Sequence, residues 1–336
     1  MRFLHTGLWA DVRELPAALG QTVAVADGVA AAADLLGTRG AERIVATGNG
    51  AAYYVAHALW LASLESAPGG PPIVAVPCGV AARAAFRWQP GDAVLAVSSS
   101  GEFRDVVEIA RGAGSRPCVA ITAREQSSLA AAADAVVLQH VASQRAVTHT
   151  QALAGAYACG LGLWAAVTGD EDLERVVGEA TEAAARAVPE AEAWAREELG
   201  GLDRPGAAVA VGGGPAWAAA LEVALMLKEI ARIPAEGVET REGATSAMFG
   251  LDRGHLMVSL DPPGDPLGEE AERMCAAAGA ATLRLPGAPD ADARLALITT
   301  LPAAAALAAQ LALDAGHDVD RPAWTDAYYA TARSAR

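Results

Sequence analysis

The sequence predicts an α/β protein with two tandem, doubly wound parallel sheets flanked by helices. Along most of the 336 residues, short apolar runs alternate with stretches that carry apolar residues at helical spacing, which is the pattern of parallel strands covered by helices. A glycine-containing segment occurs twice, as Val45–Tyr53 and Val209–Trp217, and the same offset pairs Glu65 with Glu229. A repeat of that length indicates duplication of a whole domain.

The first half of the chain predicts a helical arm and a first α/β domain. Apolar residues at helical spacing from Asp11 to Leu36, interrupted at Pro16, predict an arm over residues 1–38. Strands are predicted at Arg43–Ala46, Pro72–Val76, Ala93–Val97, Cys118–Thr122 and Ala135–Gln139. Helical stretches separate these runs, and a helix at Thr150–Val167 closes a domain that we place at residues 39–168.

The second half predicts connecting helices, a second α/β domain and a tail. Glu171–Glu198 is rich in Glu, Ala and Arg at helical spacing, so a helix pair is expected within residues 169–200. The second domain, residues 201–316, has predicted strands at Ala207–Val211, His255–Leu260 and Ala281–Leu285 and a long helix at Ala293–Ala315. Residues 317–336 form a tail that is too polar and aromatic for a core helix.

Charge and hydropathy exclude several classes of protein. The net charge of −15 argues against nucleic-acid binding, because affinity for nucleic acid comes from Lys and Arg that neutralise phosphates. The N-terminus lacks the basic and apolar regions of a secretion signal. The apolar segments Leu153–Val167 and Ala303–Ala315 are shorter than the about 20 residues that span a bilayer. We therefore expect a cytoplasmic protein that binds neither nucleic acid nor a membrane.

No metal or cofactor is expected. The four cysteines form no C-x-x-C pair, which argues against a zinc site and a disulfide framework; they are Cys78, Cys118, Cys159 and Cys275. The two glycine turns resemble dinucleotide loops, but Tyr53 and Trp217 occupy the third small position of that motif. Their rings would prevent the close helix-to-strand packing that the third glycine permits, so binding of NAD is not expected.

Three serines and a glycine, Ser98-Ser99-Ser100-Gly101, follow the apolar run that ends at Val97. Residues from Glu102 to Ala113 have helical spacing, so the serines lie where a strand leads into a helix. The unpaired N–H groups and the positive dipole end of a helix start attract anions. The turn therefore predicts a site for a sugar phosphate, with a serine N-cap beside a glycine turn as the alternative.

Four segments match motifs of one known family. Thr47–Tyr53 is similar to a C-G-T-S-Y region, and Ser98–Glu102 to an S-x-S-G-E-T phosphate loop. Leu221–Ile230 is similar to L-E-G-A-L-K-L-K-E-I, and Pro302–Pro322 to a closing helix with a G-x-D-x-D-x-P exit. In order and spacing these segments resemble the SIS (sugar isomerase) family, within it the isomerase half of glutamine:fructose-6-phosphate amidotransferase and related sugar-phosphate deaminases and deglycases. The resemblance implies two SIS-type domains and a homodimer.

The resemblance also implies roles for individual residues. The serine loop would bind a sugar phosphate, and Glu229 would move a proton between C1 and C2 through an enediol, which requires a pKa raised toward neutrality by a dry pocket. Helical spacing places Glu222, Met226 and Glu229 on one face, away from Lys228. Taken alone, Glu229 would be a surface glutamate of an amphipathic helix. The implied substrate-binding residues are Thr47, Asn49, Gly50, Ser98, Ser99, Ser100, Thr148, Glu242 and Thr245.

Departures from the family pattern bear on the activity. Phe103 stands where the family offers a hydroxyl to the phosphate, and Thr245 stands where it has the histidine that opens the sugar ring. Lys228 is the only lysine, so the tail supplies none. No glutaminase half is found, which argues against glutamine-dependent amination by this chain alone. His149 stands where the family has a small ligand-contacting residue, and its imidazole could open the sugar ring or protonate a leaving amine. The alternative is that His149 caps the following helix or forms a hydrogen bond within the core.

These observations predict an isomerase, deaminase or deglycase that acts through an enediol or enolamine on a ketose or aminosugar, with Glu229 and His149 as catalytic residues. A phosphorylated substrate is favoured. One alternative is a non-catalytic sugar-phosphate-binding regulator, which the loss of the ring-opening histidine favours. Another is an enzyme of specialised metabolism with a non-phosphorylated sugar derivative as substrate, which Phe103 favours. The expected partners are a small sugar or sugar phosphate and a second copy of the chain.

Overall fold

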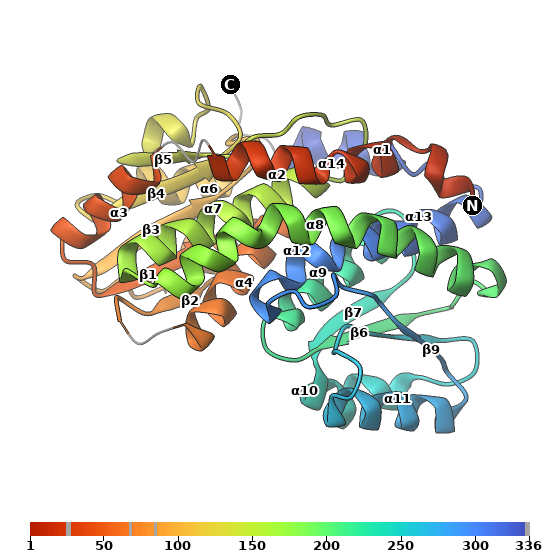
Figure 1. Ribbon diagram of the computed structural model, residues 1–336. Coiled ribbons are helices and arrows are strands. Elements are labelled where there is room, and N and C mark those ends of the chain that lie inside the picture. The colour runs from red at the N-terminus through yellow and green to blue at the C-terminus, as the bar shows by residue number, and fades with distance from the viewer. Residues whose placement is uncertain (25–27, 67–68, 84–85, 333–336) are drawn as a thin grey trace. The chain divides into compact units, whose positions relative to one another are not determined.

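The computed structural model describes residues 1–24, 28–66, 69–83 and 86–332. The chain forms two compact units, each built on one parallel sheet (Figure 1). The serine-loop unit comprises Ala17–Ala142, Gln151–Ala180 and Trp324–Arg336, and the carboxylate unit comprises Met1–Pro16, Ser143–Thr150 and Thr181–Ala323. The predicted fold class, two doubly wound α/β domains with flanking helices, is confirmed. The proposed domain boundaries stay a prediction.

The serine-loop unit has a five-stranded sheet of order β2-β1-β3-β4-β5 with all neighbours parallel. Its strands are β1 (Arg43–Thr47), β2 (Ile73–Ala75), β3 (Asp92–Val97), β4 (Cys118–Thr122) and β5 (Ala135–Leu138). Every residue of β3 and β4 is buried. Both faces of the sheet are therefore covered, as is typical of parallel sheets, and this explains why the strands could be recognised as continuous apolar runs.

Seven helices lie wholly or mostly within the described residues of the serine-loop unit. They are α2 (Leu15–Ala24), α3 (Val29–Thr38), α4 (Ala51–Glu65), α5 (Cys78–Ala81), α6 (Arg104–Arg111), α7 (Thr150–Thr168) and α14 (Thr325–Ala332), with a 3-10 turn at Ala130–Ala132. Of these, α3, α4 and α6 contact the strands of that sheet. Val94 and Ala96 of β3 pack in one cluster with Val106 and Val107 of α6. The intervening strand residues point to the opposite face, where α4 contacts the strands β1, β2 and β3.

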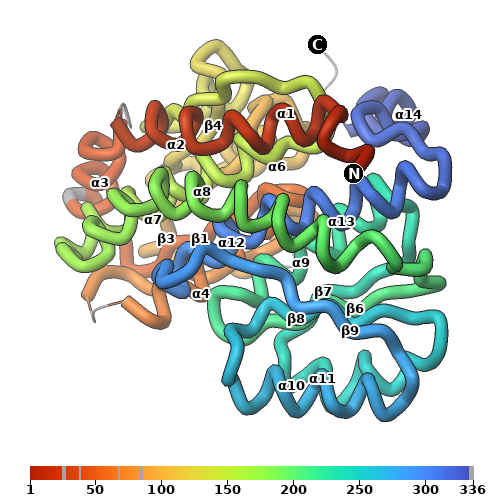
Figure 2. Tube along the Cα trace, turned by 45° about the vertical axis from the view of Figure 1, so that its right-hand side comes forward, coloured from red at the N-terminus to blue at the C-terminus, as the bar shows by residue number. Residues whose placement is uncertain are grey.

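The carboxylate unit has a four-stranded parallel sheet of order β7-β6-β8-β9. Its strands are β6 (Ala208–Gly212), β7 (Ala235–Glu239), β8 (Leu256–Ser259) and β9 (Ala281–Arg284). The helices are α1 (Gly7–Arg13), α9 (Ala216–Glu229), α10 (Thr240–Thr245), α11 (Pro266–Ala278), α12 (Ala296–Thr299) and α13 (Leu301–Asp314), with 3-10 turns at Arg2–His5, Leu199–Gly201, Ala247–Gly250 and Ala293–Leu295. In Figure 2, α10 and α11 cover one face of the sheet and α9 covers the other.

The exit segment that follows α13 holds the N-terminal helix. One carboxylate oxygen of Asp320 accepts the N–H of Gly7 at 2.8 Å, and the other accepts the N–H of Leu8 at 2.8 Å. These two donors belong to the first turn of α1, where backbone N–H groups have no partner within the helix. Asp320 therefore satisfies the start of α1 and favours its positive dipole end.

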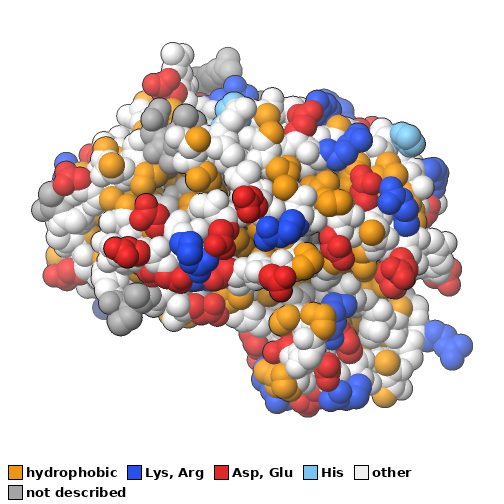
Figure 3. Space-filling model, viewed as in Figure 1, with side chains coloured by type: hydrophobic (Ala, Val, Ile, Leu, Met, Phe, Trp, Pro, Cys, Tyr) orange, Lys and Arg blue, Asp and Glu red, His pale blue; other side chains and the backbone are white. Residues whose placement is uncertain are grey.

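The predicted helix pair at residues 171–198 is wrong, because the segment is one helix, α8 (Glu171–Glu198). Pro189 lies inside it without ending it. Ion pairs on its surface support the helix: Arg175 pairs with Asp172 at 2.7 Å and with Glu179 at 2.6 Å. Figure 3 shows acidic and basic side chains interspersed along this helix. The boundary between the two units falls within α8.

Two other elements differ from the prediction. Strand β7 was not expected, because its sequence Ala235-Glu236-Gly237-Val238-Glu239 has no apolar run; it lies at the edge of its sheet, where polar residues are tolerated. The tail contains the helix α14, although it was expected to lack a core helix. Most of its residues are exposed, so it is a surface helix.

Among the described residues, one continuous helical stretch is long and apolar enough to cross a membrane. It spans Ala293–Asp314 with a mean hydropathy of 1.7, and 94% of its most apolar window is buried within the protein. The segment at Ala303–Ala315 was expected to be too short, but the preceding turns lengthen the helical run to 22 residues. Its burial is that of a core helix packed against α9.

Candidate functional site

The serine loop lies at the carboxyl edge of its sheet, next to the turn that follows β1. The strands β1 and β3 are neighbours with Thr47 opposite Ala96, so the turn at residues 48–50 and the loop at residues 98–103 leave the same edge. In the order β2-β1-β3-β4-β5, the connections from β1 and β3 diverge to opposite sides. Ligands of open α/β sheets bind at such a switch point.

Hydrogen bonds hold the serine loop in a fixed shape. Gly101, with φ of 65°, donates its N–H to the carbonyl of Ser98 at 3.1 Å. The carbonyl of Gly101 accepts the N–H of Leu129 at 2.9 Å. The carboxylate of Glu102 accepts the N–H of Ser128 at 3.0 Å and its hydroxyl at 2.8 Å. The segment at residues 127–129 therefore holds the loop in place through hydrogen bonds to Gly101 and Glu102.

The two central serines have backbone groups available for a ligand. Within the described part of the chain, the N–H groups of Ser99 and Ser100 donate no hydrogen bond. Ser98 is buried and its hydroxyl accepts the N–H of Gly101 at 3.2 Å, whereas Ser99 and Ser100 are partly exposed. This pattern fits an anion-binding loop: one serine supports the turn, and two offer N–H donors.

The turn after β1 contributes a buried hydroxyl and a side-chain amide. Thr47 is fully buried, and its hydroxyl has no hydrogen-bond partner among the described residues. The amide oxygen of Asn49 lies 2.6 Å from the thiol of Cys78. Burial raises the pKa of Cys78 to about 11, so the thiol is protonated and donates to Asn49. Gly50 is exposed, with φ of 54°.

Phe103 packs against the tail. Its ring centroid lies 5.9 Å from that of Tyr328 and 6.5 Å from that of Tyr329, both in α14. It also contacts the core cluster beneath α6. The ring of Phe103 therefore has a packing role within the serine-loop unit.

In the carboxylate unit, strand β8 holds the place in the sheet that β3 holds in the serine-loop unit, and an aspartate lies just after its carboxyl end. Asp261 follows β8, and its carboxylate accepts the N–H of Gly213 at 2.7 Å and the hydroxyl of Thr240 at 2.6 Å. The protein's own carboxylate thus takes the place at the turn after β6 that an anion would take. Sequence reasoning missed Asp261, although its position directly after a buried strand was a usable signal.

We predict that Asp261→Ala lowers the free energy of unfolding by about 3 kcal/mol, because it leaves the Gly213 N–H and the Thr240 hydroxyl without a partner in a buried site. Asp265→Ala is the control, since it removes the single cap bond to the N–H of Gly268 at 2.8 Å, worth about 1 kcal/mol. Urea denaturation of both variants measures the difference. Equal losses would contradict the role of Asp261.

Helix α9 places two glutamates on one face, as predicted. Glu222 is 4% exposed, Met226 is 1% exposed, and Lys228 points to solvent. Burial raises the pKa of Glu229 to about 7, and the positive charge of Lys228 opposes this increase. Burial and the charge of Glu229 raise the pKa of Glu222 to about 8. A carboxyl group with a pKa near 7 can take and return a proton at neutral pH.

The other predicted residues of the carboxylate unit lie in two places. Thr148 and Thr150 flank His149, and both threonine hydroxyls are buried without a partner among the described residues. Nε2 of His149 lies 2.6 Å from the side-chain nitrogen of Gln144. Glu242 and Thr245 are exposed on α10, where the Thr245 hydroxyl donates to the carbonyl of Glu242 at 3.1 Å.

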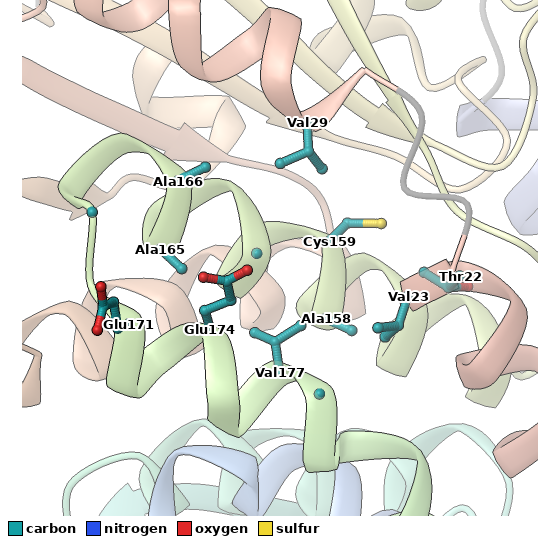
Figure 4. A pocket seen from close by; sticks show the side chains of 13 residues that line it. Thr22, Val23, Val29, Ala158, Cys159, Ala165, Ala166, Glu171, Glu174 and Val177 are labelled. Atoms are coloured by element: carbon teal, nitrogen blue, oxygen red, sulfur yellow. The ribbon is translucent and has the colours of Figure 1, made fainter.

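The serine-loop unit also contains a groove that none of the predicted residues line. It has a volume of about 630 Å³ and lies between α2, α3, α7 and α8. Figure 4 shows that its walls are mostly small and apolar, with the carboxylates of Glu171 and Glu174 on the α8 side. It provides no acid–base group paired with an anion-binding loop, so we do not place the site there.

Solved structures share this fold. The C-terminal domain of glucosamine-fructose-6-phosphate aminotransferase from Francisella tularensis matches with a TM-score of 0.79 and 18% identity, covering 94% of this chain and 98% of that chain. A candidate phosphosugar isomerase from Silicibacter pomeroyi matches with a TM-score of 0.75 and 23% identity, covering 94% of this chain and 99% of that chain. Glucosamine-6-phosphate deaminase from Thermotoga maritima matches with a TM-score of 0.72 and 18% identity, covering 94% of this chain and 97% of that chain.

Sequence comparison adds nothing to this likeness. No protein-family model matches the chain, and no curated protein matches it. The structural likeness shows the fold alone, and it agrees with the two α/β domains with parallel sheets that the sequence predicts.

Proposed function

We propose that the protein is a phosphosugar-processing enzyme that moves a proton at the carbon next to a carbonyl, through an enediol or enolamine. The observation that carries this proposal is Glu229, a largely buried carboxyl group whose pKa burial raises to about 7. Abstraction of a proton beside a carbonyl requires a base of this strength, close to the operating pH. An isomerase, a deaminase and a deglycase share this step.

The proposal assigns binding of the substrate's phosphate to the serine loop. The free N–H groups of Ser99 and Ser100 and the nearby start of α6 suit an oxyanion. Thr47, Asn49 and Gly50 lie at the same sheet edge and are proposed as further contacts. Structures of similar fold include proteins named as acting on phosphorylated sugars, which supports a phosphorylated ligand here.

His149 is proposed as the second acid–base group. Two buried threonine hydroxyls without partners among the described residues flank it, and such groups can bind sugar hydroxyls. Thr148, Glu242 and Thr245 stay candidate substrate contacts. Because Thr245 has no titratable group, an open-chain substrate fits the proposal best. A homodimer and a cytoplasmic location are further parts of the proposal.

A thermal-shift screen followed by turnover assays tests the proposed function. The screen would use hexose and aminosugar phosphates beside their non-phosphorylated counterparts. We expect a stabilising shift with at least one phosphorylated sugar and conversion of that sugar by the protein. Binding without conversion of any hit would favour the non-catalytic regulator. Stabilisation by the non-phosphorylated sugars alone would contradict the role of the serine loop and favour the specialised enzyme.

A further inference from the structure

The inner face of α9 holds a carboxyl group to which the proposed function gives no role. Glu222 is 4% exposed, and its Oε2 has no hydrogen-bond partner among the described residues. It lies seven residues, or about two helical turns, before Glu229 on the same face, with the buried thioether of Met226 between them. The charge of Glu229 reaches Glu222 and raises its pKa.

The elements packed most closely against α9 carry no cation among their described residues. The closest packed are β6, β7, α12 and α13. Their described residues carry only acidic charges, Glu236 and Glu239 on β7 and Asp314 at the end of α13. On α9 itself, Lys228 is exposed and lowers the pKa of Glu229, whereas burial and the charge of Glu229 raise the pKa of Glu222. Glu222 is therefore buried with a carboxylate as its charged neighbour.

We propose that Glu222 is a proton-bearing positioning residue for Glu229: near neutral pH the two carboxyl groups hold one proton between them, and it stays on Glu222. Two carboxyl groups on one buried face cannot both ionise easily, so the less solvated one keeps its proton. Glu222 is the more deeply buried of the two. Glu229 is then left ionised and available as the base, so this inference rests on the proposed function.

Met226 is the reason that this arrangement differs from the motif that α9 resembles. The motif L-E-G-A-L-K-L-K-E-I has a lysine at the position of Met226. An ammonium group there would lie one turn from both carboxyl groups and would stabilise both as anions. The apolar thioether provides no such charge, so the second carboxyl group can be buried only in its neutral form.

Carbon-13 NMR of protein labelled at the glutamate carboxyl carbon tests the proposal, because aspartates such as Asp261 give no signal. In the wild type we expect two glutamate resonances that titrate above about pH 6, well separated from ordinary glutamates. Glu222→Gln should remove the resonance with the higher midpoint. Glu229→Gln should remove the other and move the Glu222 midpoint to lower pH, because the repelling charge is gone. Glu236→Gln, at an exposed site, should remove neither.

Several outcomes would overturn the proposal. One is a wild type in which no glutamate titrates above about pH 6. Another is a high-midpoint resonance that survives Glu222→Gln. If Glu222→Gln does not fold, the Glu229→Gln spectrum decides alone: a remaining high midpoint that has moved down supports the pair, and an unchanged midpoint excludes it.

Stability against pH provides an independent readout. Below the ordinary glutamate pKa of 4.5, both carboxyl groups are protonated in the folded and unfolded chain. As the pH rises from 4.5 to about 8, the unfolded chain releases these protons while the folded protein keeps them, so stability falls with pH. Glu222→Gln should make this fall in urea midpoint shallower, whereas an unchanged slope would count against the proposal.

Neither readout needs turnover, so the two proposals can fail separately. If the two glutamates titrate as expected but the protein converts no sugar phosphate, the proposed function is contradicted and the proposal of a carboxyl pair is supported. If turnover depends on Glu229 but Glu222 titrates in the range of ordinary glutamates, the proposal of a carboxyl pair is contradicted and the proposed function is supported.

Discussion

Glu229→Gln is expected to reduce kcat by about 10²–10⁴-fold, which is the contribution of a positioned general base. The amide keeps the size of the carboxyl group, so the helix face and its packing should be preserved. Binding of the phosphorylated ligand should change little, because the proposal assigns the phosphate to the serine loop. The measurement is steady-state kinetics on the sugar identified in the thermal-shift screen, with ligand affinity determined in parallel.

The control for this variant is Glu236→Gln, which makes the same chemical change at an exposed residue of β7. It should keep the wild-type kcat. Full activity in Glu229→Gln would remove Glu229 from the mechanism. A raised KM with an unchanged kcat would instead assign Glu229 to substrate binding.

The pH dependence of the wild-type enzyme follows from the same residue. As a base, Glu229 must be ionised, and burial raises its pKa to about 7. The rate should therefore rise with pH and level off above about 7, where an ordinary glutamate would already level off near 4.5. A rate that stays constant from about pH 5 to 8 would show that no group with the proposed pKa of Glu229 controls the reaction.

The fold could be predicted wherever burial leaves a pattern in the sequence. Strands β3 and β4 are buried on both faces, so they are continuous apolar runs. Strand β7 is an edge strand in which only one of five residues, Val238, is β-branched or strongly apolar, and pairing with β6 determines its conformation. The segment Glu171–Glu198 was expected to be a helix pair but is the single helix α8. Pro189 lies within α8 without ending it, although an internal proline normally breaks a helix.

The candidate site could be predicted only in part, because its chemistry depends on environment. Spacing placed Glu222 and Glu229 on one face, but the depth of burial that raises the pKa of each is a tertiary property. The packing of Phe103 could not be predicted from the sequence either, because its ring contacts Tyr328, which lies more than two hundred positions further along the chain. No local pattern indicates which distant aromatic ring covers a loop.

The serine loop provides the second large expected effect. Gly101 has φ of 65°, a conformation that side chains rarely adopt, and a Cβ there would overlap Oγ and Cβ of Ser127. Rotation of the Ser127 hydroxyl cannot relieve the overlap with its Cβ, so Gly101→Ala must displace either the loop or its support. We expect strong loss of binding to the phosphorylated ligand together with a lower free energy of unfolding.

Gly114 provides a matched control within the same unit. It has the same φ of 65°, but no atom lies within 4 Å of a Cβ built on it. Gly114→Ala should therefore cost only the backbone strain, about 1–2 kcal/mol, and leave ligand affinity unchanged. Gly101→Ala should cost about 1–3 kcal/mol more, as overpacking does. Urea denaturation and ligand titration measure both quantities, and equal affinity in the two variants would show that the shape of the serine loop does not govern binding.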